Sequence, residues 1–245
     1  RELQPLIDGM NRVMERLRLL LTHQKRFVRD ASHQLRTPLA VLKVQVQSAR
    51  RGDLPADEAL KEIEATVDRA TNLANQMLSL AKVEQLRQQE APATAWDAIV
   101  REVSLDLAPL IAEKMLDFEL QADAPVWVHA HEWMLRELVR NLLHNAIRHA
   151  PSGSALWVAL RLTNHNRQAC LHIIDQGPGL SEELIQRLYQ PFSAGDSRNG
   201  SGLGLAICLE IVQALGGSLE LRNREQAGAV EGLVAMTTLP IAGTT

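Results

Sequence analysis

Apolar side chains recur at helical spacing through the first 81 residues. Between residues 6 and 20 they step by four, three, four and three, the spacing of a coiled coil, and a second stripe runs from residue 28 to residue 49. The stretch "RGDLPADE" interrupts the pattern, with Gly52 as a helix stop and Pro55 near the next start. A third stripe covers residues 60–81. The sequence predicts an antiparallel hairpin of two helices. Because one hairpin buries too little core by itself, two should pair into a four-helix bundle.

The pattern changes after residue 95 to a mixture of strands and helices. The polar stretch "RQQEAPATA" before it indicates a linker, which we place at residues 89–95. Alternating apolar positions predict strands in residues 116–122 and 125–130. Further strands are predicted in residues 154–163, 168–175, 218–223 and 232–240. Helical periods predict helices in residues 131–150, 181–189 and 202–217. Because strands and helices do not strictly alternate, an α+β domain over residues 96–245 is favoured over a doubly wound parallel sheet.

Charge is distributed unevenly along the chain, although the formal net charge is only −3. Residues 1–52 hold 11 Lys and Arg against 4 Asp and Glu, residues 53–91 hold 4 against 8, and the remainder holds 11 against 17. The basic first segment could face an acidic partner or a membrane surface, or it could be a solvated helix face. The net charge argues neither for nor against nucleic acid.

Cysteine usage and hydropathy narrow the class of protein. Cys170 and Cys208 lie far apart without metal-ligand spacing, which indicates core thiols in a reducing compartment. No apolar run approaches ~18 residues, so no membrane span is predicted. Because the first residue already lies inside a helical pattern, the chain is expected to be part of a longer protein.

One histidine and one proline share the second helical stripe. His33 lies two residues from both Ala31 and Leu35, ~200° around a helix, so its ring should point to solvent if those two residues face the core. Pro38 has no amide proton, so the helix should bend beside His33; a bend without any role is the alternative. An exposed imidazole can act as a nucleophile. The hairpin offers no substrate pocket, so a donor would have to come from the other domain.

Two glycine clusters in the second domain are typical of phosphate-binding loops. They are "DQGPG" at residues 175–179 and "GSGLGL" at residues 200–205. Glycine lets backbone amides approach phosphate closely, and the second cluster opens a predicted helix. Neither cluster fits a dinucleotide-binding fingerprint, which needs a strand directly before it, or a P-loop, which needs Gly-Lys-Ser/Thr.

Two asparagines of the predicted helix 131–150 could serve the same site. Asn141 and Asn145 are four residues apart and therefore share one helix face. Neutral amide oxygens suit Mg²⁺ that is bound mostly by phosphate and water. The alternative is that both amides are simply solvated.

Five motifs occur together in one order: "SHQLRTPL", "NLLHNA", "DQGPG", "PF" and "GSGLGLAI". In this order and spacing they resemble the sensor histidine kinases of two-component systems over essentially the whole chain. Residues 1–22 look like the last helix of a HAMP linker, 23–88 like the dimerisation and histidine phosphotransfer hairpin, and 96–245 like the catalytic ATP-binding domain of the histidine-kinase/gyrase/chaperone type. "FVRDASHQLRTPL" is most similar to the tricarboxylate-transport sensors.

The resemblance implies a function and a setting. The chain would be the cytoplasmic portion of a bacterial inner-membrane receptor, anchored by its full-length protein, and would act as a homodimer. With ATP and Mg²⁺ it would phosphorylate itself, pass the phosphoryl group to a response regulator, and also dephosphorylate that partner. No nucleic acid is implied.

The resemblance also assigns roles to residues in the first domain and on the asparagine helix. His33 would be the autophosphorylated residue, and Thr37 would position water when the partner is dephosphorylated. Asn145 would coordinate Mg²⁺, Asn141 would support the phosphates, and Arg148 would face phosphate.

The remaining site residues belong to the nucleotide pocket and its lid. By resemblance, Asp175 would accept a hydrogen bond from the adenine amino group, and Gly177 and Gly179 would shape the adenine pocket. The lid and its flanks would contribute Phe192, Gly200, Gly202 and Gly204.

Three features depart from the family pattern. Gln34 follows the histidine where the family usually has Glu or Asp, and an amide can orient the imidazole but cannot act as a general base. The rate of autophosphorylation is therefore in question. "FSAGD" stands where an aromatic-Arg pair is common, and Arg198 could substitute. The lid from Ser193 to Asn199 is short, which would let it order readily or hold ATP loosely.

Two other functions are compatible with this type of domain. ATP-hydrolysing machines on the same fold carry a carboxylate four residues before the metal-binding asparagine, where this chain has Asn141. An amide is not a base, so transfer to a protein group is favoured over hydrolysis. A phosphatase-biased or inactive signalling scaffold is the other alternative, and Gln34 favours it.

Overall fold

The computed structural model describes residues 4–122, 124–163, 167–181, 203–226 and 229–243. The chain forms two compact units, residues 1–77 and residues 78–245. Among the described residues, no helix is both long enough and apolar enough to cross a bilayer.

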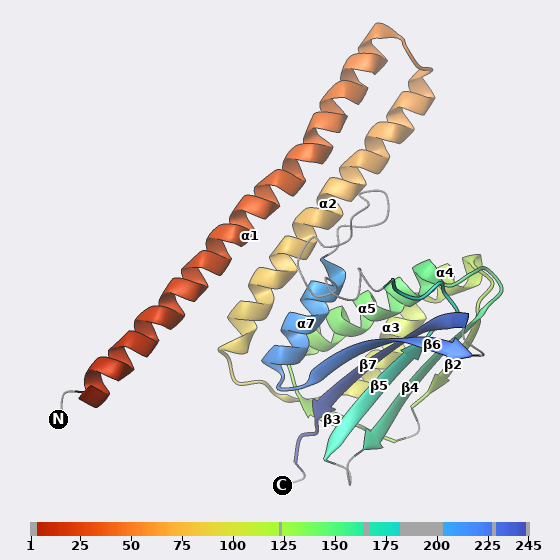
Figure 1. Ribbon diagram of the computed structural model, residues 1–245. Coiled ribbons are helices and arrows are strands. Elements are labelled where there is room, and N and C mark those ends of the chain that lie inside the picture. The colour runs from red at the N-terminus through yellow and green to blue at the C-terminus, as the bar shows by residue number, and fades with distance from the viewer. Residues whose placement is uncertain (1–3, 123, 164–166, 182–202, 227–228, 244–245) are drawn as a thin grey trace. The chain divides into compact units, whose positions relative to one another are not determined.

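Two long helices, α1 (Gln4–Arg51) and α2 (Ala56–Arg87), confirm the predicted hairpin (Figure 1). Gly52 ends α1 with a φ of +77°, in the left-handed region that glycine adopts without strain. The amide nitrogens of Gly52 and Asp53 donate to the carbonyl oxygens of Ala49 and Ser48 at 3.1 and 3.2 Å, which satisfies two carbonyl groups of the last turn. Pro38 lies inside α1, and the expected bend there stays a prediction.

Much of the apolar surface of the hairpin is open in the single chain. Leu39, Val44 and Leu60 are 58%, 63% and 63% exposed. The other large apolar side chains exposed between residues 36 and 77 are Val41, Val46 and Val67. Exposed apolar side chains mark interaction sites where they gather into large patches.

The last turns of α2 belong to the second unit. Val83 is only 2% exposed, and the Lys82 ammonium lies over the Trp133 ring, 4.2 Å from its centroid. A cation at this distance is attracted by the aromatic face. These contacts join the end of α2 to the start of the helix that carries the asparagine pair.

The second unit is built on a five-stranded sheet with the order β2-β4-β5-β7-β6. Its strands are β2 (Asp117–Gln121), β4 (Ala155–Thr163), β5 (Gln168–Ile174), β7 (Ala229–Pro240) and β6 (Ser218–Gln226). β2 pairs parallel with β4, and the other neighbours are antiparallel. One parallel pair among antiparallel ones confirms the α+β class.

A small second sheet pairs β1 (Ala93–Ala95) with β3 (Trp127–His129). β1 falls inside the segment that the sequence indicated as a linker. A bridge between Val128 and Ile241 joins this small sheet to the end of the chain. The start and the end of the domain are therefore held at the same place.

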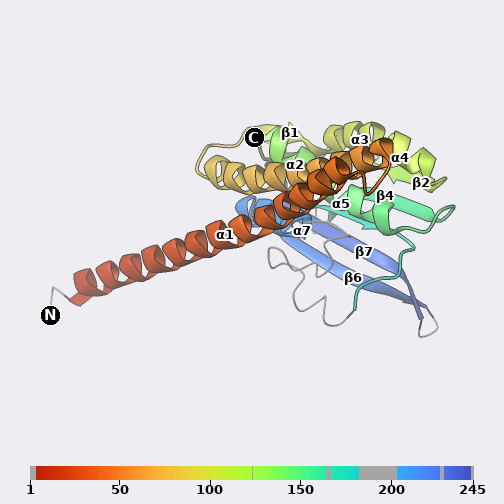
Figure 2. The same ribbon diagram turned by 90° about the horizontal axis from the view of Figure 1, so that it is seen from above.

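Helices cover one face of the large sheet (Figures 1 and 2). They are α3 (Trp96–Asp106), α4 (Ala108–Glu113), α5 (Glu132–His149) and α7 (Gly204–Ala214). Alternate residues of the sheet point at them: Leu156, Val158, Leu171 and Ile173 are each at most 1% exposed. This period of two is the pattern that predicted the strands.

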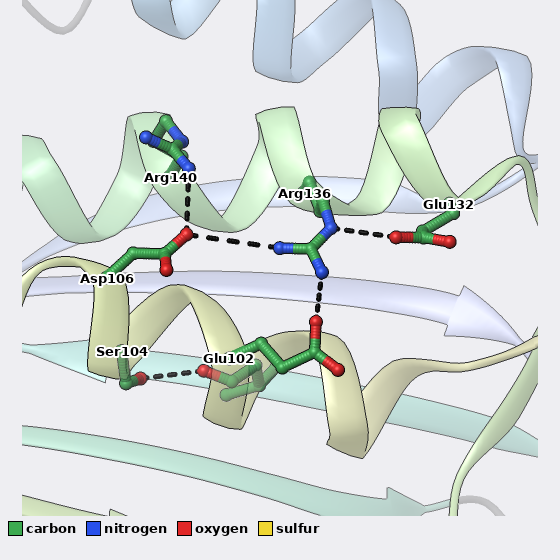
Figure 3. Close-up of polar contacts among 7 residues, drawn as sticks. Glu102, Ser104, Asp106, Glu132, Arg136 and Arg140 are labelled. Atoms are coloured by element: carbon green, nitrogen blue, oxygen red, sulfur yellow. Dashed lines mark hydrogen bonds and ion pairs between the residues drawn. The ribbon is translucent and has the colours of Figure 1, made fainter.

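Ion pairs hold α3 against α5 on the surface of this layer (Figure 3). Arg136 of α5 contacts Glu102 and Asp106 of α3 as well as Glu132 of its own helix, and Arg140 donates to Asp106 at 3.0 Å. Isolated exposed pairs contribute little to stability, but a network of several charges contributes more. The network fixes the face of α5 next to the one that carries the asparagines.

Candidate functional site

The predicted nucleophile lies on the exposed side of α1. His33, Gln34 and Thr37 are all exposed. The Thr37 hydroxyl donates to the carbonyl oxygen of His33 at 3.4 Å, which ties it to the same turn of helix. The ring is exposed among the residues that the structure describes.

The asparagine pair meets the start of α7. A Cβ atom built on Gly204 would lie 3.2 Å from Asn141 Oδ1 and 4.0 Å from Asn145 Nδ2. Both asparagines are half-buried. The structure therefore brings together the asparagine motif and the last glycine of "GSGLGL", which lie about 60 residues apart in the sequence. A side chain at residue 204 would fill the space beside the two amides.

Asp175 lies buried at the end of β5, only 4% exposed. Its Oδ1 accepts a hydrogen bond from the Gly177 amide at 2.7 Å. Burial raises the pKa of the Asp175 carboxyl group, and the Gly177 amide and the nearby His149 and Arg224 partly oppose that rise. The carboxylate is thus held in one orientation in a largely dry environment.

Glycines let the backbone close around Asp175. A Cβ atom on Gly177 would lie 2.9 Å from Asp175 Oδ1 and 3.0 Å from the carbonyl oxygen of His149. A Cβ atom on Gly232 of β7 would overlap the carbonyl oxygen of Asp175. Glycine is therefore required at both positions by close approach of the backbone.

Asn223 of β6 holds the end of the "DQGPG" turn, and sequence analysis missed it. Its Oδ1 accepts from the Leu180 amide at 2.8 Å, and its Nδ2 donates to the Leu180 carbonyl oxygen at 2.9 Å. Gly179 precedes this clamp with a φ of +72°. The contact joins residues 43 apart, so no local pattern could have predicted it.

Glu137 is the second residue that the sequence analysis missed. The side-chain nitrogen Nδ2 of Asn141 donates to the backbone carbonyl oxygen of Glu137 at 2.9 Å and to the Glu137 carboxylate Oε1 at 3.1 Å. The spacing of four residues on a predicted helix is the signal that could have found this pair.

Arg148 lines a shallow hollow between α4 and α5. The hollow has a volume of about 310 Å³ and is shared with Leu110, Glu113, Lys114, His144 and Ile147. Lys114 Nζ donates to the carbonyl oxygens of Arg148 and Ala150 at 2.6 and 2.9 Å, which satisfies the end of α5. The expectation that Arg148 faces phosphate stays a prediction. Phe192, Arg198, Gly200 and Gly202 lie outside the described residues.

The polar groups of the site suit a nucleotide with a hard cation better than a metal bound by the protein alone. No cluster of three or more His, Cys, Asp or Glu side chains that could hold a metal occurs in the described part of the chain. The amide oxygen of Asn141 beside Gly204 matches Mg²⁺, which keeps water and phosphate as most of its ligands. The residues present therefore fit Mg²⁺ bound together with a nucleotide.

Two protein families match the chain. Residues 23–86 match the histidine kinase A phospho-acceptor domain, and residues 130–242 match the histidine kinase-, DNA gyrase B-, and HSP90-like ATPase. The first match contains His33. The second contains Asn141, Asn145, Asp175 and Gly204, the residues that the structure groups around α5 and the start of α7.

Individual relatives agree with this division. The chain is 34% identical over 236 residues to the sensor protein QseC of Salmonella typhi, which covers 93% of this chain and 51% of the relative. The chain thus spans about half the length of the curated relatives it matches. The fold is similar to that of the Acinetobacter baumannii histidine kinase AdeS, with a TM-score of 0.69 and 23% identity, covering 86% of this chain and 98% of that one. The histidine kinase ThkA in complex with the response regulator protein TrrA matches with a TM-score of 0.69 and 21% identity, covering 99% of this chain and 67% of that one.

Proposed function

Because the chain belongs to the sensor histidine kinases of two-component systems, we propose that it transfers the γ-phosphoryl group of ATP to His33 and then to an aspartate of a response regulator. In the first step a neutral ring nitrogen of His33 bonds to the γ-phosphorus, the bond to the bridging oxygen breaks, and ADP leaves. The imidazole ring then releases the proton on its other nitrogen to water. In the second step the aspartate oxygen displaces the histidine nitrogen.

The contact between Gly204 and the asparagine pair carries this proposal. It supports a triphosphate site at the start of α7, where backbone amides at a helix N-terminus favour anions. Mg²⁺, when bound, would neutralise phosphate charge, and Asn145 is the residue proposed to hold it. Phosphoryl transfer relies mainly on positioning and charge neutralisation. The protein therefore needs to orient ATP and His33 and to exclude competing water.

Asp175 is the proposed adenine-binding residue. Its carboxylate would accept a hydrogen bond from the exocyclic amino group of adenine. Gly177, Gly232 and Asn223 support this role, because their contacts fix the carboxylate and the turn that follows it. A buried acceptor of fixed orientation discriminates well against bases that lack the matching donor.

The proposed partners are a second copy of this chain and a response regulator. The exposed apolar surface around Leu39, Val44 and Leu60 supports a homodimer, since pairing would cover it. ThkA in complex with its response regulator supports the second partner. Thr37 is proposed to position water when the phosphorylated partner is hydrolysed. By resemblance, we place the chain in a longer receptor anchored in the inner membrane, with residues 1–22 as the end of a HAMP linker.

A phosphatase-biased scaffold is the second candidate function, and Gln34 is the observation that favours it. Gln34 is exposed beside His33, and its amide cannot accept the imidazole proton. Hydrolysis of ATP by itself is disfavoured, because Asn141 stands where hydrolysing relatives have a carboxylate.

Phosphate chemistry tests the proposal. The chain, incubated with γ-labelled Mg·ATP, should acquire phosphate that is lost in acid and kept in alkali, and should pass it to a purified receiver domain. Asn145→Ala should abolish the label and weaken binding of Mg·ATP much more than binding of adenosine. A wild-type chain that binds ATP and dephosphorylates the receiver without ever being labelled would favour the scaffold. Alkali-labile phosphate on the chain would contradict transfer to histidine.

A further inference from the structure

We infer that Glu137 is a positioning residue that locks the Asn141 amide with its oxygen toward the nucleotide, so that Asn141 would coordinate Mg²⁺ or accept a hydrogen bond from its water and would not donate to phosphate. This inference rests on the proposed function of the site. It differs from the role that the resemblance implies for Asn141, which is to support the phosphates.

The hydrogen bonds of Asn141 fix which way its amide faces. Nδ2 lies 2.9 Å from the carbonyl oxygen of Glu137 and 3.1 Å from its Oε1. A backbone carbonyl group and a carboxylate can only accept. The opposite amide orientation would place three acceptor oxygens against one another, so the nitrogen must face Glu137.

Both N–H groups of the amide are used in this arrangement. One points at the carbonyl oxygen and the other at the carboxylate, which leaves Asn141 with Oδ1 as its free polar atom. Oδ1 lies on the side of α7, 3.2 Å from the position of a Cβ atom on Gly204. The group that Asn141 presents to a nucleotide is therefore an acceptor.

An acceptor cannot bond to phosphate oxygens, which also only accept. It can coordinate a hard cation or accept from a water molecule on that cation, and oxygen is the ligand type that Mg²⁺ requires. The Glu137 carboxylate adds a negative charge behind the amide. The negative charge of Glu137 and the oxygen of Asn141 would both favour a cation beside the amide.

Three substitutions separate the hydrogen bond from the charge. Glu137→Met removes the side-chain hydrogen bond and the charge, with similar side-chain length, while the bond from Asn141 Nδ2 to the backbone carbonyl oxygen of residue 137 remains. Glu137→Gln removes the charge and keeps an acceptor oxygen for Asn141 Nδ2. Glu137→Asp keeps the charge but is one methylene shorter, so the carboxylate should no longer reach the amide. The hydrogen bond is the decisive contact if Glu137→Gln binds Mg·ADP as the wild type does and Glu137→Met and Glu137→Asp bind it more weakly.

Calorimetric binding of ADP, with Mg²⁺ and with a chelator, measures the effect independently of catalysis. Glu137→Met and Glu137→Asp should weaken Mg·ADP binding by roughly 3- to 10-fold, the loss expected for one hydrogen bond. Glu137→Gln should weaken it by less than about 2-fold. Binding in the chelator should change little in all three variants. The side-chain amide resonances of Asn141 should move in Met and Asp but stay in place in Gln.

The control is the same substitution in an Asn141→Ala background, where Glu137→Met should have no further effect. Equal losses of Mg·ADP binding in Glu137→Met and Glu137→Gln would overturn the inference, since the charge alone would then account for the effect. Unchanged binding in Met and Asp would also overturn it, as would equal losses with and without Mg²⁺. A variant that melts before binding can be measured leaves the other two to decide. Failure of the proposed function is distinguishable, because Asn145→Ala would then leave Mg·ADP binding unchanged.

Discussion

The hairpin and the second unit differ in how much of their apolar surface a single chain can bury. Leu39, Val44 and Leu60 of the hairpin are more than half exposed, whereas Leu135 and Leu171 of the second unit are fully buried. A sheet with one helical layer closes a core by itself. Two long helices bury less, which is why we propose that the hairpin pairs with a second copy.

The two regions differ in the same way in their chemistry. His33 is exposed on a helix, and the Thr37 hydroxyl donates to its carbonyl oxygen. Asp175 is enclosed by Gly177 and Gly232 and held by a backbone amide. In the proposed function His33 meets two different partners and has to be open, whereas Asp175 recognises one base and has to be fixed and dry. The proposed division between acceptor and binding site follows from that difference.

The largest expected effect is on assembly. Residues 1–90 should form a dimer, since covering each large aliphatic side chain is worth ~1.5–3 kcal/mol. Residues 78–245 should be a folded monomer that binds ATP. Sedimentation at micromolar concentration measures both. A folded, monomeric 1–90 fragment would show that the exposed stripe is not a dimer interface.

Gly232→Ala should strongly disturb the second unit while leaving the hairpin intact. The added Cβ atom would overlap the backbone of Asp175, which cannot move away as a side chain could. Overpacking of this kind costs about 1–3 kcal/mol. Thermal unfolding of residues 78–245 measures it, with Gly243→Ala as the control, because nothing lies within 4 Å of that position. Equal melting temperatures for the two variants would refute the close approach.

Asp175→Asn should weaken ATP binding and stabilise the empty domain. Loss of one hydrogen bond to a charged acceptor costs about 1.5–3 kcal/mol, roughly 10- to 150-fold in Kd. The Asn oxygen can still accept from Gly177, so the turn should persist. Calorimetry and thermal unfolding without nucleotide give the two values. A parallel loss of stability and affinity would mean that Asp175 is structural.

The stability gain should depend on pH. Because burial raises the pKa of Asp175, the folded chain holds that proton more tightly than the unfolded chain does. Its stabilising contribution is full below the ordinary Asp pKa of about 3.9, and is lost as pH rises through the raised value. The free energy of unfolding of the Asp175→Asn variant should therefore exceed that of the wild type above the raised pKa of Asp175, and not below the ordinary Asp pKa.

Gln34→Glu should have the smallest effect, a few-fold rise in the rate of His33 labelling. General-base assistance is typically worth ~10²–10⁴-fold, but an amide can orient the ring as a carboxylate does, so we expect most of that gain to be absent. Gln47→Glu on the same helix is the control for added charge. The rate of receiver dephosphorylation should be measured separately. An unchanged or lower labelling rate would show that the proton passes to solvent or that another step is limiting.

Sequence pattern predicted the parts of the fold that rest on local rules. Gly52 and Pro55 mark the hairpin turn because glycine permits a positive φ and proline favours a helix start. The strands around Leu156 and Leu171 were predicted from short apolar stretches bounded by polar and glycine-rich segments. β1 is only three residues long, too short to show a period, and it lies inside the predicted linker. Helices α3 and α4 were not predicted at all.

The candidate site was predictable as a set of motifs but not as a set of contacts. That Asn141 and Gly204 meet depends on how α5 and α7 pack over the sheet. Asn223 of β6 forms two hydrogen bonds with Leu180, which lies 43 residues earlier in the chain, and no spacing rule predicts such a contact. Glu137 was within reach of a helical spacing rule, but its meaning depends on which atoms of the amide face it.

The division between an open acceptor and an enclosed ATP site is tested most directly by one variant with two readouts. His33→Gln should bind Mg·ATP as the wild type does and acquire no acid-labile phosphate. His129→Gln, an exposed histidine of the second unit, should bind and be labelled normally. Phosphate on the His33→Gln chain, or loss of its nucleotide binding, would contradict the account.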